Sequence, residues 1–304
     1  MIKQLLLSIL LIHATLAAGK GGGKINGPPT KKWLTLNGVE PVVVARGGFS
    51  GVAPDSSQGA FTLAQVSSLP STILLCDLQL TKDGEGFCLS DINLANSTDI
   101  NTVYPDQQKS YNIDGRDLKG WFGFDYTAKD LFENHPTFYD RRKLSPALYI
   151  EDTMQDLKPA YISSPEIGFL KALGQKVDPA ATKLVLRLMG IDEVEPTTKE
   201  KYGSLLQKLP MIKTFASGII VPKEFIWPVD DARILQPASN LVSDAHKAGL
   251  EVFAAGFAND NYVSYNYSYD PAKEYLQYID NPQFSIDGMI TDFPATASEA
   301  IGRL

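Results

Sequence analysis

The sequence predicts an α/β fold built on parallel strands. Short apolar runs alternate with helical patterns along most of the chain. The runs are apolar nearly throughout, which is typical of strands covered on both faces, as parallel strands are. Strands that alternate with helices indicate repeated strand–helix–strand units.

Seven segments have the length and composition of buried strands. They begin after residue 40 and recur to the end of the chain. In order, the predicted strands are Pro41–Ala45, Ile73–Leu80, Ala147–Glu151, Lys183–Leu188, Gly218–Val221, Glu251–Ala255 and Gly288–Thr291.

The segments between the strands contain helical patterns and loops. The clearest helix is Leu241–Gly249, whose last glycine suits a C-cap before the next strand. Weaker patterns predict helices at Gly59–Ser67 and Glu166–Leu173. Polar stretches at 87–96, 135–143 and 194–202 predict loops.

The strands are expected to close into a barrel. An open dinucleotide-binding sheet would carry a G-x-G-x-x-G turn after its first strand, and none is present. Seven or eight strands over roughly 260 residues fit a (β/α) barrel better. We therefore predict one barrel domain over 41–304.

The N-terminus has the order of charged, apolar and small residues seen in secretory signal peptides. Lys3 precedes an apolar run that is too short to span a bilayer, and alanines follow it. Residues 1–18 are predicted to be this signal and 19–40 a Gly/Pro-rich leader and entry segment. The prediction places the mature chain outside the cell, at the cell wall or surface. We expect it to have no transmembrane span, and no lipid-anchor signal is seen at the C-terminus.

Charge and composition exclude one class of partner. The 304 residues carry a net charge of −7, with an isoelectric point near 5.1. Nonspecific nucleic-acid binding needs basic surface, so we expect no nucleic-acid partner.

Secretion bears on the cysteines and on two sequons. Cys76 and Cys88 are the only cysteines, and an oxidising compartment permits a disulfide. Two free, half-buried thiols are an equal alternative. Asn96 and Asn266 each begin an N-x-S/T sequon and are candidate glycosylation sites, although chance matches are common.

Charged residues gather where strands end, which is where barrel active sites lie. Arg46 ends the first predicted strand before two glycines, Asp77 interrupts the second, and Glu151 ends the third. Two neighbouring carboxylates could hold a divalent cation, and a guanidinium fits phosphate geometry. The alternative is an internal ion pair between Arg46 and one of these two carboxylates.

At these residues the sequence resembles the glycerophosphodiester phosphodiesterases. Their pattern is H-R-G … P-E-N-T … E-x-D-V-x-x-T-K-D-G … H-D … I-E … G-x-x-V … D-G-x-x-T-D-x-P. The resemblance covers nearly all of the chain after Trp33. The sequence of these motifs is most similar to that of the plant glycerophosphodiester phosphodiesterase-like proteins. Those proteins usually carry two tandem barrels. The matching blocks are ARGGFSG-x-x-PDSS (Ala45–Ser57), LCDLQLTKDG (Leu75–Gly84), LSD (Leu89–Asp91), YIE (Tyr149–Glu151), AHKAGLEVFAAGFAND (Ala245–Asp260) and DGMITDFP (Asp287–Pro294).

The resemblance implies a (β/α)8 TIM barrel of the phospholipase C-like phosphodiesterase type. It implies a Ca²⁺- or Mg²⁺-dependent hydrolase that releases glycerol 3-phosphate and an alcohol from a glycerophosphodiester. By this resemblance, Arg46 would grip the phosphate, while Asp77 and Glu151 would bind the cation.

At three positions where the family has a catalytic or metal-binding side chain, this sequence has a residue that cannot serve that role. The two histidines correspond to Ala45 and Ser90, and one metal-binding glutamate corresponds to Leu75. Proton transfer by such groups is worth about 10²–10⁴-fold in rate. Asp55 and Asp91 are the candidate substitutes, since the chain's few histidines are predicted to lie in the signal, in a loop or on an outer helix.

Two functions follow from these departures. The first is a metal-dependent phosphodiesterase with a degraded site and a weakened cation site. The alternative is a non-catalytic secreted barrel that binds phosphate or sugar ligands at the cell surface. A glycosidase fits less well, because an arginine beside two glycines suits a phosphate and not an oxocarbenium ion.

Overall fold

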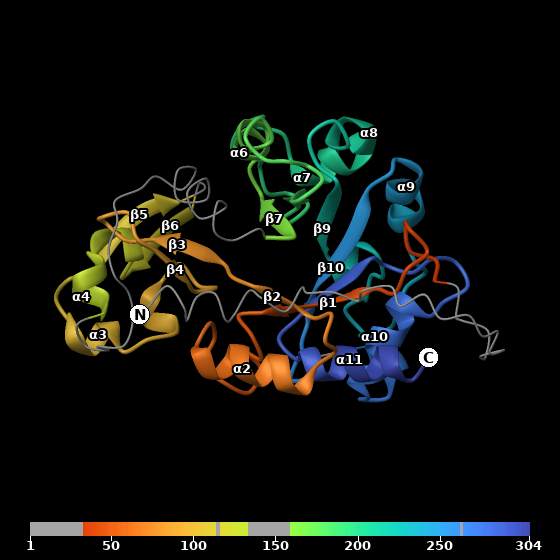
Figure 1. Ribbon diagram of the computed structural model, residues 1–304, viewed down its shortest axis with the longest axis horizontal. Helices are drawn as coiled ribbons and strands as arrows, with labels where there is room; N and C mark the ends of the chain where they lie inside the picture. Colours follow the sequence, from red (N-terminus) through yellow and green to blue (C-terminus); the bar gives the residue numbers. More distant parts are fainter. Residues whose placement is uncertain (1–32, 114–115, 133–158, 262–263) are drawn as a thin grey trace, which may run out of the picture.

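The computed structural model describes residues 33–113, 116–132, 159–261 and 264–304. Its centre is a seven-stranded parallel sheet in the order β2-β1-β11-β10-β9-β8-β7. Figure 1 shows the strands changing direction across this curled sheet, from the nearly horizontal β1 and β2 to the steep β10 and β9. The strands are β1 (Val42–Arg46), β2 (Ile73–Leu75), β7 (Tyr161–Ser164), β8 (Lys183–Arg187), β9 (Gly218–Pro222), β10 (Glu251–Phe257) and β11 (Gly288–Thr291).

Six of the seven predicted strands lie in this sheet. The remaining one, Ala147–Glu151, lies outside the described residues, as do residues 1–32 and the predicted loop 135–143. β7 was not predicted, because its sequence, YISS, is short and half polar.

Two apolar layers hold the sheet, as alternation along the strands requires. Val44, Val185 and Ile220 face the inside of the curled sheet and pack with Phe253 and Ile290. Neighbouring residues on the same strands face outward into a larger core shared with the helices.

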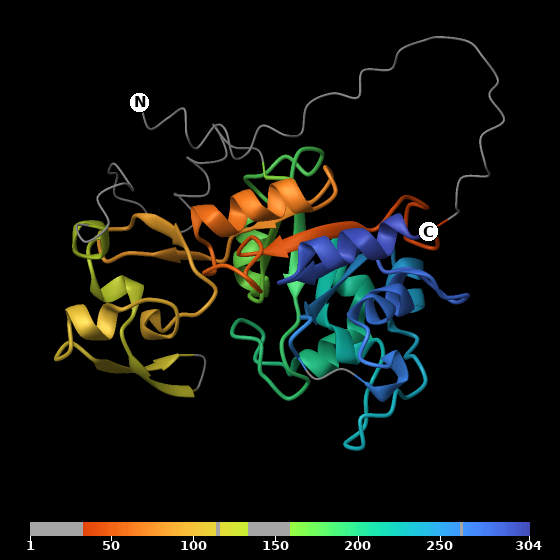
Figure 2. The same ribbon diagram turned by 90° about the horizontal axis from the view of Figure 1, so that it is seen from below.

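The helices cover the outer face of the sheet (Figures 1 and 2). Two of them, α2 and α10, have side-chain N-caps: Ser57 accepts a hydrogen bond from Ala60 N, and Asp270 accepts one from Ala272 N. They are α2 (Gln58–Ser67), α6 (Ile167–Leu173), α7 (Tyr202–Leu205), α8 (Leu209–Ile212), α9 (Leu241–Lys247), α10 (Pro271–Ile279) and α11 (Pro294–Gly302), with short 3₁₀ turns η3 (Leu206–Lys208), η4 (Lys223–Phe225) and η5 (Tyr265–Tyr267). The three predicted helices are confirmed as α2, α6 and α9.

A small lobe follows β2 and projects from the barrel (Figure 1). The predicted strand 73–80 is broken at Cys76–Asp77, so that only its first half joins the barrel. The lobe has its own core around Leu94 and Tyr126. It contains β3 (Leu78–Leu80), β4 (Gly86–Cys88), η1 (Leu94–Asn96), α3 (Ile100–Val103), β5 (Lys109–Ile113), β6 (Arg116–Gly120), η2 (Gly123–Asp125) and α4 (Ala128–Phe132).

A disulfide joins the lobe to the barrel strand. Cys76, directly after β2, is bonded to Cys88 at the end of β4. The bridge fixes the place where the chain leaves the barrel and enters the lobe.

The entry segment contacts the end of the barrel at which the strands begin. Leu36 N donates to Asp287 Oδ1 at 2.8 Å, and His246 Nε2 lies 2.8 Å from Asp287 Oδ2. His246 is thus at the end where the strands begin. Across the described ranges, we find no helix with the length and apolar character that a membrane span requires.

Candidate functional site

A cavity of about 410 Å³ opens at the carboxyl ends of the parallel strands. This is the end at which barrel enzymes carry their active sites. Its apolar part is formed by residues such as Ile220 and Ile290 at the top of the barrel interior. Its polar lining includes Arg46, Ser163, Arg187, Glu224, Asn261 and Asp292.

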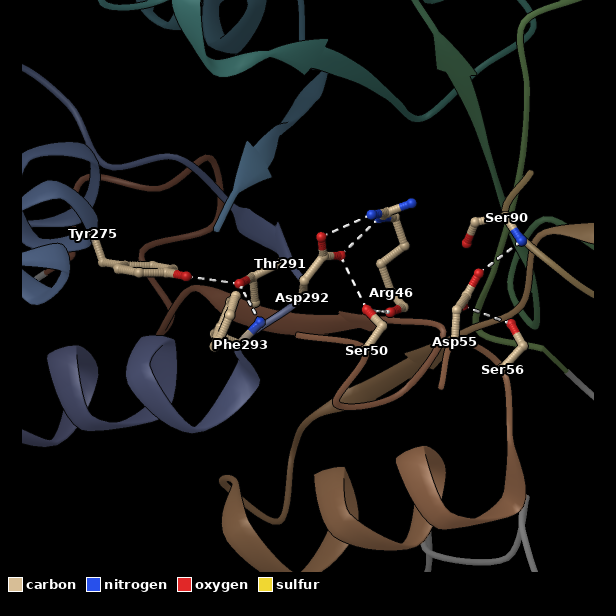
Figure 3. A network of polar contacts seen from close by, with 9 residues as sticks. All are labelled: Arg46, Ser50, Asp55, Ser56, Ser90, Tyr275, Thr291, Asp292 and Phe293. Atoms are coloured by element: carbon tan, nitrogen blue, oxygen red, sulfur yellow. Dashed lines mark hydrogen bonds and ion pairs between the residues drawn. The ribbon is translucent and has the colours of Figure 1, made fainter. Parts of the chain in front are cut away.

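Arg46, the last residue of β1, points along the cavity wall toward Asp292 (Figure 3). Its Nε donates to Oδ1 and its Nη2 to Oδ2 of Asp292, both at 2.8 Å. Ser50 Oγ lies 3.2 Å from the same Oδ1. The ion pair considered from the sequence therefore exists, but with Asp292, which sequence reasoning did not include among the site residues.

Electrostatics keep Arg46 fully charged. Burial alone would lower its pKa, but the hydrogen bonds and charge of Asp292, with smaller contributions from Asp77 and Asp55, raise the pKa above its ordinary value. A guanidinium has five N–H donors, and Nη1 bonds to none of the described residues. With 36% of its side chain exposed, Arg46 can still offer Nη1 to a ligand.

Asp77 lies where the predicted strand breaks, and its partner is a second arginine. Arg187 ends β8, and its Nη1 lies 3.4 Å from Asp77 Oδ1. Arg187 also lines the cavity. Arg187 lies within the predicted strand Lys183–Leu188 but was not predicted as a site residue, because nothing local shows that β8 and the segment after β2 come together.

The glycines after Arg46 serve packing instead of leaving room for a ligand. Gly47 and Gly48 have positive φ of 59° and 83°. A Cβ on Gly47 would lie 1.7 Å from Asp55 Oδ1, and one on Gly48 would lie 2.4 Å from the backbone of Ala60 in α2. A side chain at either position is therefore excluded, because Asp55 and α2 already fill the space that it would occupy.

Asp55 ties two loops together. Its Oδ2 accepts from Ser90 N at 3.0 Å, and Ser56 Oγ donates to its Oδ1 at 2.9 Å (Figure 3). Ser90 Oγ, at the second histidine position, is buried and has no hydrogen-bond partner among the described residues. Ala45, at the first histidine position, is fully buried.

Asp91 is engaged in local structure within the lobe. Its Oδ1 accepts from Asn93 N at 2.9 Å, and its Oδ2 accepts from Asn96 Nδ2 at 2.7 Å. Both contacts stabilise the turn at η1. Neither Asp91 nor Asp55 lines the cavity.

The described donors do not fit a divalent cation. Hard cations prefer several oxygen ligands, usually carboxylates. Leu75 lines the cavity with an apolar side chain, and Asp77 is paired with Arg187. Within the described ranges, no group of three His, Cys, Asp or Glu side chains gathers to hold a metal. The other predicted ligand, Glu151, lies outside those ranges.

Comparison with known proteins shows close relatives in a plant. The chain is 48% identical to glycerophosphodiester phosphodiesterase GDPDL7 of Arabidopsis thaliana, and 47% identical to GDPDL6, over 99% of its own length. It spans 45% of the length of each of these relatives. No protein-family model matches the chain.

A solved structure supports the fold. The chain is similar to a crystal structure from Agrobacterium tumefaciens, described as a glycerophosphoryl diester phosphodiesterase, with a TM-score of 0.50 and 16% identity. The match covers 88% of this chain and 98% of that one. The curled parallel sheet is therefore the TIM-barrel fold of that structure.

Proposed function

The chain belongs to the glycerophosphodiester phosphodiesterase family, and we propose that it binds glycerophosphodiesters in the cavity at the mouth of its barrel. The proposal assigns it, at most, a slow phosphodiesterase activity. The observation that carries it is the presence of Arg46 and Arg187, from β1 and β8, in the lining of one cavity.

The two arginines suit the anionic group of such a ligand. Guanidinium groups recognise phosphate oxygens through paired hydrogen bonds. Glu224 and Asn261, in the same lining, have oxygens that can accept hydrogen bonds from the hydroxyls of glycerol. The apolar floor would face the ligand's carbon atoms.

Slow chemistry follows from the missing proton carriers. Ala45 has no ionisable group, and a serine such as Ser90 is a poor acid or base near neutral pH. The carboxylate of Asp55, a candidate substitute for the missing histidines, accepts hydrogen bonds from two loop residues. A non-catalytic binding role at the cell wall or surface, after export through the N-terminal signal, is therefore the second candidate function.

Calorimetric titration with glycerophosphocholine tests binding, and release of glycerol 3-phosphate tests hydrolysis. We expect measurable binding that Arg46→Met weakens by about 10- to 100-fold, because a charge-assisted contact is lost. We expect turnover at least about 10²-fold below that of a histidine-containing relative.

The matched control is Arg303→Met. Arg303 is also paired with a carboxylate, Glu299, but directly follows α11 and lies outside the cavity lining. Equal affinity in the wild type and in Arg46→Met would contradict the proposed site. Turnover comparable to that of the histidine-containing relative would contradict the proposal that hydrolysis is slow.

A further inference from the structure

Arg187 pairs with Asp77, the carboxylate that the family resemblance assigns to cation binding. We propose that Arg187 supplies the positive charge that a divalent cation would otherwise supply at Asp77, so that the cavity binds its anionic ligand without a cation. This inference rests on the function proposed above and gives that site a second anion-binding residue.

The first argument is geometric. Arg187 and Asp77 come from segments 110 residues apart, yet Nη1 and Oδ1 lie 3.4 Å apart. The Arg187 side chain is 38% exposed and lines the cavity, whereas Asp77 is 23% exposed. The guanidinium is therefore held by the carboxylate at one side and open to the cavity at another.

The second argument is the chemistry of the donors. Leu75, two residues before Asp77, stands where the family pattern has one carboxylate, and it lines the cavity with an apolar side chain. The loss of a carboxylate among the described residues weakens a Ca²⁺ or Mg²⁺ site, whereas an arginine can pair with a single carboxylate.

The third argument is electrostatic. Asp77 also acts on Arg46, since its charge helps to raise the pKa of that guanidinium. One carboxylate thus lies within reach of two fixed positive charges. A divalent ion added at Asp77 would be repelled at short range by Arg187, whereas the charge of Arg46 is largely offset by Asp292.

The experiment compares binding with and without cations in the full chain. Glycerophosphocholine is titrated into wild-type protein, Arg187→Met and the control Arg303→Met, first in EDTA and then with added calcium or magnesium. We expect the wild-type dissociation constant to be the same in both buffers. We expect Arg187→Met to raise it about 10- to 100-fold, and Arg303→Met to leave it unchanged.

The outcomes separate this inference from the function on which it rests. Wild-type binding that appears only with a cation, or an Arg187→Met variant with wild-type affinity, would overturn the role of Arg187 and leave the proposed function standing. Failure of the wild type to bind in either buffer would remove the proposed function, and this inference with it.

A titration with calcium alone gives an independent readout. We expect no calcium binding by the wild type. We expect Leu75→Glu combined with Arg187→Met to gain it, because the double variant adds a carboxylate and removes the competing charge. Thermal melts confirm that each variant is folded. Calcium binding by the wild type that Asp77→Ala abolishes would contradict the inference directly.

Discussion

At the scale of single residues, Asp55, a candidate catalytic residue from the sequence, makes hydrogen bonds that give it a structural role. Asp55 accepts hydrogen bonds from Ser90 N and Ser56 Oγ and fills the space beside Gly47. It thereby joins the loop after β1 to the start of the lobe. This places Asp55 in the support of the cavity wall and away from its lining.

We expect Asp55→Ala to lower the free energy of unfolding by about 1–3 kcal/mol, because it leaves the Ser90 N–H without its acceptor. Denaturant titration measures this value. Asp106→Ala, at an exposed aspartate, serves as the control and should change it by less than about 0.5 kcal/mol. An unchanged stability in Asp55→Ala would contradict the supporting role.

The two sequons differ in how their asparagines are engaged. Asn96 Nδ2 donates to Asp91, whereas Asn266 is held through Oδ1 by Leu235 N at 2.9 Å and by Ser264 Oγ at 2.9 Å. The amide nitrogen that a glycan would modify is thus free of hydrogen bonds at Asn266 within the described part of the chain. Exposed Tyr265 and Tyr269 flank it.

We propose that both asparagines are glycosylated on export, and that the fold tolerates the glycan better at Asn266. Mass spectrometry of the chain secreted from a eukaryotic host should find glycopeptides containing Asn266, and these should disappear in Asn266→Gln. A secreted chain with an unmodified Asn266 would contradict the prediction. Asn96→Gln should leave glycosylation at Asn266 unchanged.

At the scale of elements, one buried carboxylate orders the loop between β8 and α7. Glu195 is fully buried and accepts hydrogen bonds from Ile167 N at 3.0 Å and Thr197 N at 3.1 Å. Thr198 N and Oγ1 also donate to it, at 2.5 and 2.7 Å. The sequence indicated a loop at 194–202, but only the folded chain shows that this loop caps the start of α6.

These contacts make part of the stability depend on pH. Burial alone would raise the pKa of Glu195, but the hydrogen bonds from Thr198, Ile167 and Thr197 outweigh it and lower the pKa. A carboxylate whose pKa is lower in the folded state stabilises the fold above its ordinary pKa of 4.5, and this contribution is lost as pH falls through the folded value.

We expect Glu195→Gln to cost about 2 kcal/mol or more at neutral pH. The difference from the wild type should shrink as the pH falls below about 4.5, the ordinary value for glutamate. Denaturant midpoints across pH measure it. Glu200→Gln is the control, since Glu200 lies in the same loop but pairs with a partly exposed lysine. A difference that grows toward acid pH would refute the assignment.

At the scale of the whole molecule, the disulfide holds the lobe to the barrel. The Cys76–Cys88 bond closes a loop with a sequence separation of 12, which corresponds to about 3 kcal/mol through the entropy of the unfolded chain. We expect reduction to lower stability by about this amount. The Cys76→Ser/Cys88→Ser double variant should match the reduced wild type and should not respond to reductant.

Loss of the disulfide should also weaken ligand binding in the cavity. Asp77 follows Cys76 directly, and Asp77 O accepts from Leu89 N at 3.0 Å, next to the bridge. We expect the double variant to bind glycerophosphocholine more weakly than the wild type while remaining folded, as judged by its far-ultraviolet circular dichroism. Unaltered affinity would show that the bridge does not position Asp77.

The sequence by itself determined the strand order along the chain and the barrel, because buried parallel strands appear in the sequence as local apolar runs. It determined the family because the motifs of that family occur in the same order. It also singled out Arg46 and Asp77 as candidate site residues. Only the tertiary structure decided their partners. Asp292, directly after β11, and Arg187, at the end of β8, lie 246 and 110 residues away in the sequence, and no local pattern encodes which distant charge a side chain will meet.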